Sequence, residues 1–133
     1  MSPEKSDLLK EKYPTIFSQL DYFECGDGWF YIIDKLCSLL QNEMRNASYG
    51  LPPEDAAELQ PVAVQVKEKF GGLRFYIDGG TDTMRGMISA VESISHITCE
   101  SCGNRGGKKG KAWIRTMCDG CWDQHGKRRF DSV

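Results

Sequence analysis

Apolar residues recur every three to four positions in three segments of this chain, and each segment predicts an amphipathic helix. Residues 6–20 show this spacing around Pro14, so we expect a helix that either kinks or restarts with the proline in its first turn. Residues 28–45 carry the longest apolar stripe and predict the principal core helix, with Cys37 buried as a small hydrophobic residue. Residues 82–97 predict a further helix, which leads directly to a cluster of cysteines.

Residues 62–78 instead alternate apolar and polar side chains on both sides of Gly71 and Gly72, which is the pattern of a β-hairpin. A two-residue Gly71-Gly72 turn pairs Val66 with Ile77. A three-residue loop is excluded, because it would scatter the apolar residues over both faces of the hairpin. The two-residue turn gathers them on one inner face, which then holds Val62, Val64, Val66, Leu73, Phe75 and Ile77.

The polar residues of the hairpin divide between its two faces. Glu68 falls on the inner face, where a carboxylate must lie near the open end of the sheet or beside a buried cation. The outer face is a candidate partner-binding surface, although an ordinary solvated sheet face has the same pattern. We call this outer face the basic strip, and it consists of Lys67, Lys69, Arg74 and Tyr76.

Four cysteines near the C-terminus form two CxxC pairs, Cys99/Cys102 and Cys118/Cys121, separated by fifteen residues. Each pair places two thiolates on one side of a tight turn, and two facing turns complete the tetrahedron that Zn²⁺ prefers. Gly103 allows the chain to leave the first turn in a conformation that few other residues adopt. The spacing therefore predicts a structural zinc ion in a closed site, with no open position for a substrate.

Other uses of the cysteines fit the sequence less well. Six cysteines could form a disulfide framework, but the polar segment 1–7 lacks the apolar core of a signal peptide, which favours a reducing cytoplasm. A thioredoxin-like CxxC would need a βαβ context, and the surroundings here are rich in Gly and Lys. His96 and His125 could each replace a cysteine, but we expect both to be bystanders, with His96 in an exposed pair with Glu92.

Charge is distributed unevenly along the 133 residues. Residues 1–98 hold nine Lys/Arg and fifteen Asp/Glu, a net charge of −6, whereas residues 99–133 hold eight and four, a net charge of +4. The basic part could meet a phosphate backbone or an acidic protein, and solubility alone would also explain its charge. Its candidate contact residues are Arg105, Lys108, Lys109, Lys111, Trp113 and Arg115.

Together these elements predict an α+β fold. We expect a helical body with a hairpin over residues 1–98, and a zinc ribbon with a basic tail over residues 99–133, packed together as one unit. Within the ribbon, residues 106–110 predict a mobile turn and residues 112–117 a return strand. No apolar run approaches the roughly 20 residues that span a bilayer, so we expect no membrane partner.

The segment around Cys25 is the strongest candidate for catalysis. A cysteine in a Gly-rich loop before a helix could be a nucleophile with a lowered pKa. No histidine is obviously paired with it, so we favour residues 26–28 as a turn and N-cap, with Cys25 and Trp29 packing beneath. A divalent-ion nuclease would need carboxylates at a spacing that this chain lacks, its scattered candidates being Glu24, Asp27, Asp34 and Glu68.

Three motifs occur here in a specific order and spacing: CGDGWF at residues 25–30, VKEKFGGLRFY at residues 66–76, and the cysteine ribbon with Trp113 and Thr116 inside it. Over residues 22–121 the chain resembles a set of short, uncharacterised proteins of phages, prophages and many bacteria. Members of that set often keep part of the cysteine quartet, whereas this chain has all four. The resemblance implies the setting of a phage-type accessory protein in a host cytoplasm, rather than a mechanism.

Three functional hypotheses follow. The first is a non-catalytic zinc-binding protein that binds a host protein or protein–nucleic-acid complex, for example as an inhibitor of a defence or nucleic-acid-processing machine. The second is direct nucleic-acid binding by the ribbon and the tail Lys127-Arg128-Arg129, with Trp113 or Trp122 stacking on bases. The third, a cysteine- or carboxylate-dependent enzyme, has the least support in the sequence.

Overall fold

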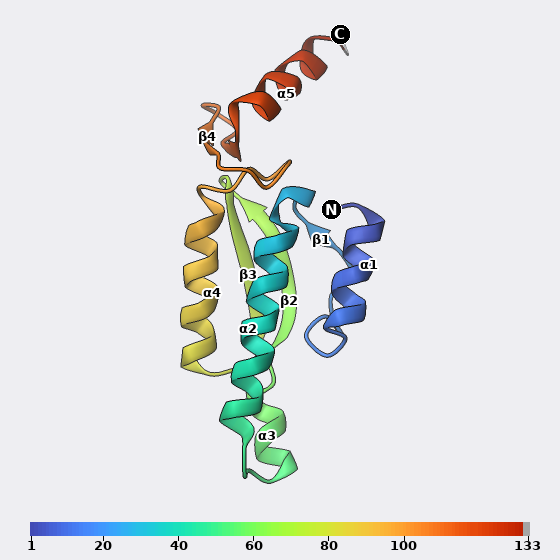
Figure 1. Ribbon diagram of the computed structural model, residues 1–133, viewed down its shortest axis with the longest axis vertical. Coiled ribbons are helices and arrows are strands. Elements are labelled where there is room, and N and C mark those ends of the chain that lie inside the picture. The colour runs from blue at the N-terminus through green and yellow to red at the C-terminus, as the bar shows by residue number, and fades with distance from the viewer. Residues whose placement is uncertain (132–133) are drawn as a thin grey trace.

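The computed structural model describes residues 1–131, with side chains as far as His125, and confirms the α+β fold (Figure 1). A short 3-10 turn, η1 (Asp27–Trp29), precedes the longest helix. The helices are α1 (Pro3–Lys12), α2 (Phe30–Ser48), α3 (Pro53–Leu59), α4 (Asp82–Ser95) and α5 (Asp119–Asp131). The strands are β1 (Phe23–Glu24), β2 (Val62–Lys69), β3 (Gly72–Asp78), β4 (Gly107–Lys109) and β5 (Arg115–Met117).

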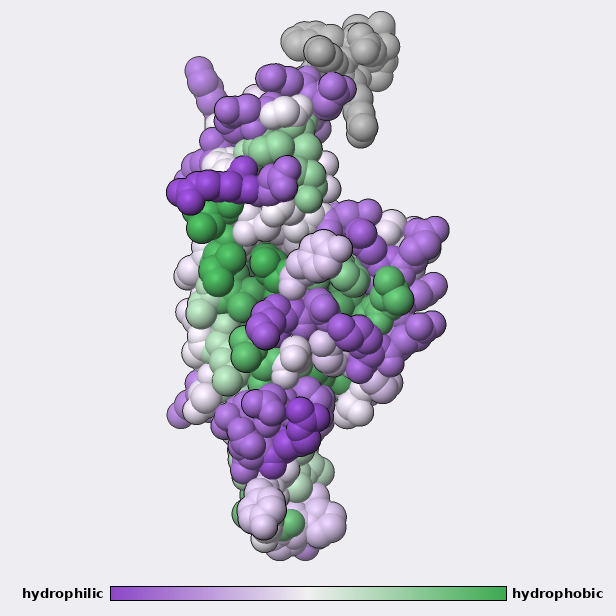
Figure 2. Space-filling view, in the orientation of Figure 1, coloured by the Kyte–Doolittle hydropathy of each residue, from purple (hydrophilic) through white to green (hydrophobic). Residues whose placement is uncertain are grey.

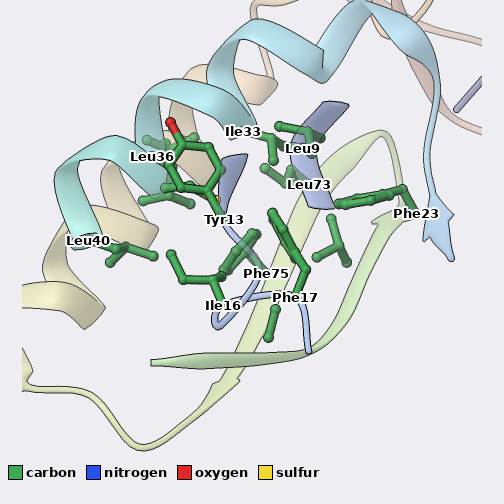
Figure 3. Packing of buried hydrophobic residues seen from close by; sticks show 14 of the residues in the cluster. Leu9, Tyr13, Ile16, Phe17, Phe23, Ile33, Leu36, Leu40, Leu73 and Phe75 are labelled. Carbon is green, nitrogen blue, oxygen red and sulfur yellow. The ribbon is translucent and has the colours of Figure 1, made fainter. Parts of the chain in front are cut away.

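The hydrophobic core lies between the helices and one face of a three-stranded sheet. The sheet has the order β1-β2-β3, with β1 parallel and β3 antiparallel to β2. Figure 3 shows apolar side chains from α1, α2 and the sheet meeting in this layer. The expected core helix at residues 28–45 and the helix at residues 82–97 are both present, as α2 and α4. Fully buried residues include Leu9, Ile16, Trp29, Ile33, Leu36, Leu40, Val66, Leu73 and Met84.

The first helix ends earlier than the apolar spacing predicts. α1 stops at Lys12, and residues 14–19 form turns, so the expectation of helix up to residue 20 is wrong. Pro14 disfavours the helical conformation of the residue before it, and Tyr13 leaves the helical region with φ −130° and ψ 62°. The apolar residues beyond the proline still reach the core, since Ile16 and Phe17 are buried.

The hairpin turn lies one residue earlier than predicted. Phe70 and Gly71 form the two-residue turn, with φ of 53° and 82°, so Val66 pairs with Phe75 rather than with Ile77. Positive φ at both positions is the geometry of a turn that matches the twist of the strands. A shift of one residue in the turn moves each pairing by two positions, so this shift alone leaves the side chains on their predicted faces.

Gly72, the second glycine of the hairpin motif, lies outside the turn and makes a close contact with a neighbouring side chain. The ring of His96, at the C-terminal end of α4, lies against Gly72, and a Cβ at that position would lie 2.5 Å from His96 Cε1. Gly72 therefore belongs to β3, and Phe70 occupies the turn position that glycine would fill more easily. The Phe70 side chain is 72% exposed.

A β-bulge alters the inner face of β2. The pairing is irregular between Ala63 and Gln65, so Ala63 is buried and Val64 is 44% exposed. The prediction of Val64 on the inner face is therefore wrong, because a bulge inserts an extra residue and reverses the alternation. Glu68 lies near the turn end of the sheet, where its Oε2 accepts a hydrogen bond from the Gly71 N–H at 2.8 Å.

The C-terminal part is more regular than its composition predicts. The expected mobile turn at residues 106–110 contains β4, which pairs with β5 in the ribbon, and the charged tail forms α5. Figure 1 shows the ribbon and α5 at one end of the molecule, above the upper ends of the hairpin, α4 and η1. None of the helices within residues 1–131 combines the length and the apolar character needed to cross a membrane.

Candidate metal centre

Four thiols converge at the ribbon. The Sγ atoms of Cys99, Cys102, Cys118 and Cys121 all lie within 4.8 Å of one another, and Cys102 Sγ lies 3.7 Å from Cys118 Sγ. That separation is far longer than a disulfide bond of about 2.05 Å. It equals the edge of a tetrahedron, about 3.8 Å, around an ion with metal–sulfur bonds of about 2.3 Å. The four cysteines therefore form a closed four-sulfur group that fits a metal ion.

The pKa values of these thiols are shifted in opposite directions by their neighbours. Burial opposes ionisation of Cys99, but backbone N–H groups of the two knuckles outweigh it and lower the pKa of this thiol to about 7. Hydrogen bonding to the Cys118 sulfur raises the pKa of Cys121 to about 12. A bound metal ion would favour the thiolate form of all four residues, because cysteine ligates metals in its deprotonated form.

The first knuckle, residues 99–102, is closed by backbone hydrogen bonds. The Cys99 N–H donates to the Asn104 carbonyl at 2.7 Å, and the Gly103 N–H donates to the Cys99 carbonyl at 2.9 Å. Gly103 has a φ of 84°, which confirms the expectation that the chain leaves this knuckle in the left-handed region. The second knuckle, residues 118–121, opens α5, and there the Cys121 N–H points to Cys118 Sγ at 3.4 Å.

The CGDGW motif packs directly against the first knuckle. We call residues 26–29 the docking loop. The Gly28 N–H donates to the Glu100 carbonyl at 2.7 Å, and the indole N–H of the buried Trp29 donates to the Thr98 carbonyl at 2.9 Å. A Cβ at Gly28 would lie 2.1 Å from the Cys99 carbonyl oxygen. The glycine is therefore needed for close approach of two backbones.

The hairpin turn holds the other half of the ribbon. The Thr116 hydroxyl donates to the Gly71 carbonyl at 2.6 Å, and both groups are buried. The Thr116 carbonyl in turn accepts from the Glu100 N–H at 2.9 Å, which links β5 to the first knuckle. The two motifs that the sequence singled out are thus the two supports of the cysteine site. The sequence analysis did not predict this supporting role. The one sequence feature that could have indicated it is the density of glycines in both motifs.

Glu100 connects the docking loop to β5. Its side chain is 4% exposed, its Oε2 accepts from the Gly26 N–H at 2.9 Å, and its Oε1 lies 3.5 Å from Arg115 Nη2. Burial raises the pKa of the Glu100 carboxyl, and the neighbouring guanidinium opposes that shift. Arg115, one of the predicted contact residues, is half-buried in this ion pair.

The other predicted contact residues of the ribbon differ in how exposed their side chains are to solvent. Lys109 forms an ion pair with Asp119 at the start of α5, which raises the pKa of the lysine. The remaining four residues point to solvent, and Figure 2 shows hydrophilic residues gathered at this end of the molecule. We call these four the ribbon face, and they are Arg105, Lys108, Lys111 and Trp113. The side chains of Lys127, Arg128 and Arg129 lie outside those that the structure describes.

The basic strip lies on the outer face of the hairpin, as predicted. Lys67 and Arg74 are direct cross-strand partners, and both are half-buried. Tyr76 is 42% exposed, and the ammonium group of Lys69 lies 6.0 Å from the ring centre of Phe70. The Phe70 ring thus extends the strip toward the ribbon.

Neither histidine belongs to the four-sulfur group. His96 does not form the expected pair with Glu92, because the Glu92 carboxylate accepts a hydrogen bond from the Phe75 N–H at 2.9 Å. His125 stacks on Trp122 with ring centres 5.4 Å apart. His96 packs against Gly72 of the hairpin, and His125 packs against Trp122 within α5.

Cys25 is a packing residue, as the sequence favoured. Its side chain is 7% exposed, and burial, followed by the nearby Glu100 charge, raises the pKa of its thiol to about 12. A nucleophilic cysteine needs the opposite shift.

The scattered carboxylates serve separate structural roles. Glu24 accepts from Gln65, Asp27 from the Ser2 N–H, and Asp34 from Lys12 and Tyr13. Among the side chains that the structure describes, residues 1–125, the four cysteines are the one group of three or more potential ligands close enough to share a metal ion.

Comparison with known proteins gave no match among protein-family models, curated proteins or solved structures. The evidence for the function of this chain therefore lies in the site and its surroundings. Those surroundings combine a closed thiol cluster, two supports that hold it on the body, and an exposed basic face.

Proposed function

We propose that this chain is a small, non-catalytic zinc-binding protein that acts by binding a macromolecular complex through the ribbon face. The observation that carries the proposal is the closed four-sulfur group, held on the body by the docking loop and the hairpin turn while the ribbon face stays exposed. In this arrangement the metal stabilises a surface instead of meeting a substrate.

Zinc is the ion that best suits the donor set. Four cysteine sulfurs within 4.8 Å of one another favour zinc over magnesium or calcium, which prefer oxygen ligands. When bound, the ion would be held by Cys99, Cys102, Cys118 and Cys121 and would fix the two knuckles against each other. In small modules of this kind zinc supplies on the order of 10 kcal/mol of apparent folding free energy.

The charge distribution supports an acidic partner. The net charge is +4 over residues 99–133 and −6 over residues 1–98, so attraction is concentrated at one end of the chain. Lys108 and Lys111 are exposed, and Trp113 is 74% exposed beside them. Complementary charge of this kind steers association and fixes orientation. With the resemblance to phage-type proteins, this favours an accessory role, such as inhibiting a defence or nucleic-acid-processing machine in a host cytoplasm.

The same features support a non-catalytic role. Cys25 is buried with a pKa of about 12, and each scattered carboxylate is occupied by a structural hydrogen bond. The metal site has four protein ligands and leaves no position for a substrate.

A capture experiment with matched charge variants tests the proposal. The zinc-loaded protein is used to recover complexes from host lysate, with and without nuclease, and mass spectrometry identifies what is retained. Replacing Lys108 and Lys111 by Glu should abolish recovery. The control replaces the exposed Lys35 and Arg45 of α2 by Glu, which changes the net charge equally, and it should recover the complex as the parent protein does. Equal recovery by the two variants would contradict the proposal.

A further inference from the structure

Two hollows flank the exposed Trp113, which forms a wall of both. Their volumes are about 560 Å³ and about 220 Å³, and neither is the cavity of about 630 Å³ at the cysteine site. The 560 Å³ hollow is lined on the α5 side by Trp122 and His125, together with Lys111 and Arg115. The 220 Å³ hollow is lined on the hairpin side by Phe70.

The backbone holds Trp113 and Phe70 at the surface, whereas Trp122 is half-buried. Gly110 has a φ of 86°, and a Cβ there would lie 2.2 Å from the Trp113 carbonyl oxygen, so a tight turn presents the indole. Phe70 is fixed outward by the hairpin turn, at φ 53°. Trp122 is stacked on His125 in α5, with an interplanar angle of 24°. Phe70, Trp113 and Trp122 therefore form three aromatic platforms separated by two hollows, drawn from three separate elements.

Positive charge accompanies these platforms. Lys111 lines the larger hollow as an exposed cation, and the Lys69 ammonium lies 6.0 Å from the Phe70 ring centre. Arg115 also lines the larger hollow, but its charge is paired with Glu100. Glu68 is the one acid among the lining residues of the two hollows, and its Oε2 accepts a hydrogen bond from the Gly71 N–H. A ligand that follows the platforms would therefore meet aromatic faces and cations.

We propose that this surface binds single-stranded nucleic acid, with successive unstacked bases entering the two hollows and Trp113 as the platform between them. Flat aromatic faces beside cations match a chain of planar bases on a phosphate backbone, since each base has a face to stack and each linkage has a charge to neutralise. Bases in a duplex are already stacked on each other, so the free strand is the preferred form. This inference rests on the proposed function and narrows its partner to a complex that exposes single-stranded nucleic acid.

A binding titration tests the inference directly. Fluorescence anisotropy of a labelled single-stranded oligothymidylate, titrated with the zinc-loaded protein, should show binding that weakens steeply with salt. Trp113→Ala should weaken it roughly 5- to 150-fold, the loss expected from one stacked base, and Trp113→Phe should restore part of the affinity. The control Tyr49→Ala removes an aromatic side chain that is 90% exposed at the other end of α2, and it should leave the affinity unchanged.

Circular dichroism and zinc content establish that each variant is folded before it is titrated. Unchanged affinity in Trp113→Ala, tighter binding of the matched duplex, or an affinity insensitive to salt would each overturn the inference. The two proposals fail separately. If the oligonucleotide does not bind while a nuclease-resistant protein complex is still captured through Lys108 and Lys111, the inference is wrong and the proposed function stands. If capture does not depend on those lysines, the proposed function fails.

Discussion

Replacing Gly28 by Ala tests whether the docking loop holds the first knuckle. The new Cβ would lie 2.1 Å from the Cys99 carbonyl oxygen and 2.6 Å from the Glu100 carbonyl carbon, and both of these neighbours are backbone atoms of the knuckle. Because backbone cannot rotate away as a side chain does, the loop and the knuckle must separate. The hydrogen bond from Gly28 to Glu100 and the bond from the Trp29 indole to Thr98 are then broken or stretched.

The size of the effect follows from these two bonds. The Gly28 bond contributes about 1 kcal/mol net, and leaving the buried Trp29 indole N–H without an acceptor costs about 1–3 kcal/mol. We therefore expect Gly28→Ala to lower the free energy of unfolding by about 2–4 kcal/mol. Zinc should also be lost at a lower chelator concentration, because Cys99 moves with the knuckle.

Urea denaturation of the zinc-loaded protein measures the stability change, and chelator competition measures zinc retention. Gly86→Ala is the matched control, since Gly86 lies in α4 with nothing within 4 Å of its new Cβ. That variant should be about 0.5–1 kcal/mol more stable, because alanine favours helix over glycine. If Gly28→Ala were within about 0.5 kcal/mol of the parent protein and kept its zinc, the docking argument would be refuted.

Three further predictions concern the metal, the thiols and the hairpin turn. Cys102→Ser combined with Cys118→Ser should unfold residues 99–121 and release the metal, and a native NMR spectrum without bound metal would show that zinc is not structural. Cys25 and Cys37 are both buried, and burial raises the pKa of each thiol, so both should resist iodoacetamide at pH 8 until urea unfolds the protein. Mass spectrometry counts the modified thiols. Rapid modification of Cys25 in the native protein would contradict its packing role. Phe70→Asn should raise the free energy of unfolding, measured by urea denaturation, by about 0.5–1 kcal/mol, because asparagine tolerates positive φ better than phenylalanine. The same variant should bind oligothymidylate more weakly, and a loss of stability would mean that Phe70 packs in the folded protein.

Local patterns predicted those parts of the fold that depend on local chemistry. The apolar stripe of α2 and the capped start of α4, where the Thr81 side chain accepts from the Met84 N–H, are properties of short segments. The convergence of Cys99, Cys102, Cys118 and Cys121 follows from CxxC spacing, because each turn fixes two sulfurs.

The errors arise where distant contacts decide the local structure. Alternation alone could not separate a turn at Phe70-Gly71 from one at Gly71-Gly72, because the deciding contact is the ring of His96 against Gly72. The bulge beside Val64 also leaves no mark in the hydrophobic pattern. The docking role of Gly28 depends on Glu100, which is 72 positions away in the chain, so no local rule could assign it.

The bond between Trp29 and Thr98 spans 69 positions and has a consequence for the order of folding. During synthesis, α2 and its buried tryptophan leave the ribosome long before the first knuckle exists. Until that knuckle docks, the indole N–H of the buried Trp29 has no acceptor from Thr98, and the core stays incomplete. A nascent chain of this protein should therefore remain sensitive to proteases until residues 99–121 emerge, and metal capture should coincide with the final closure of the body.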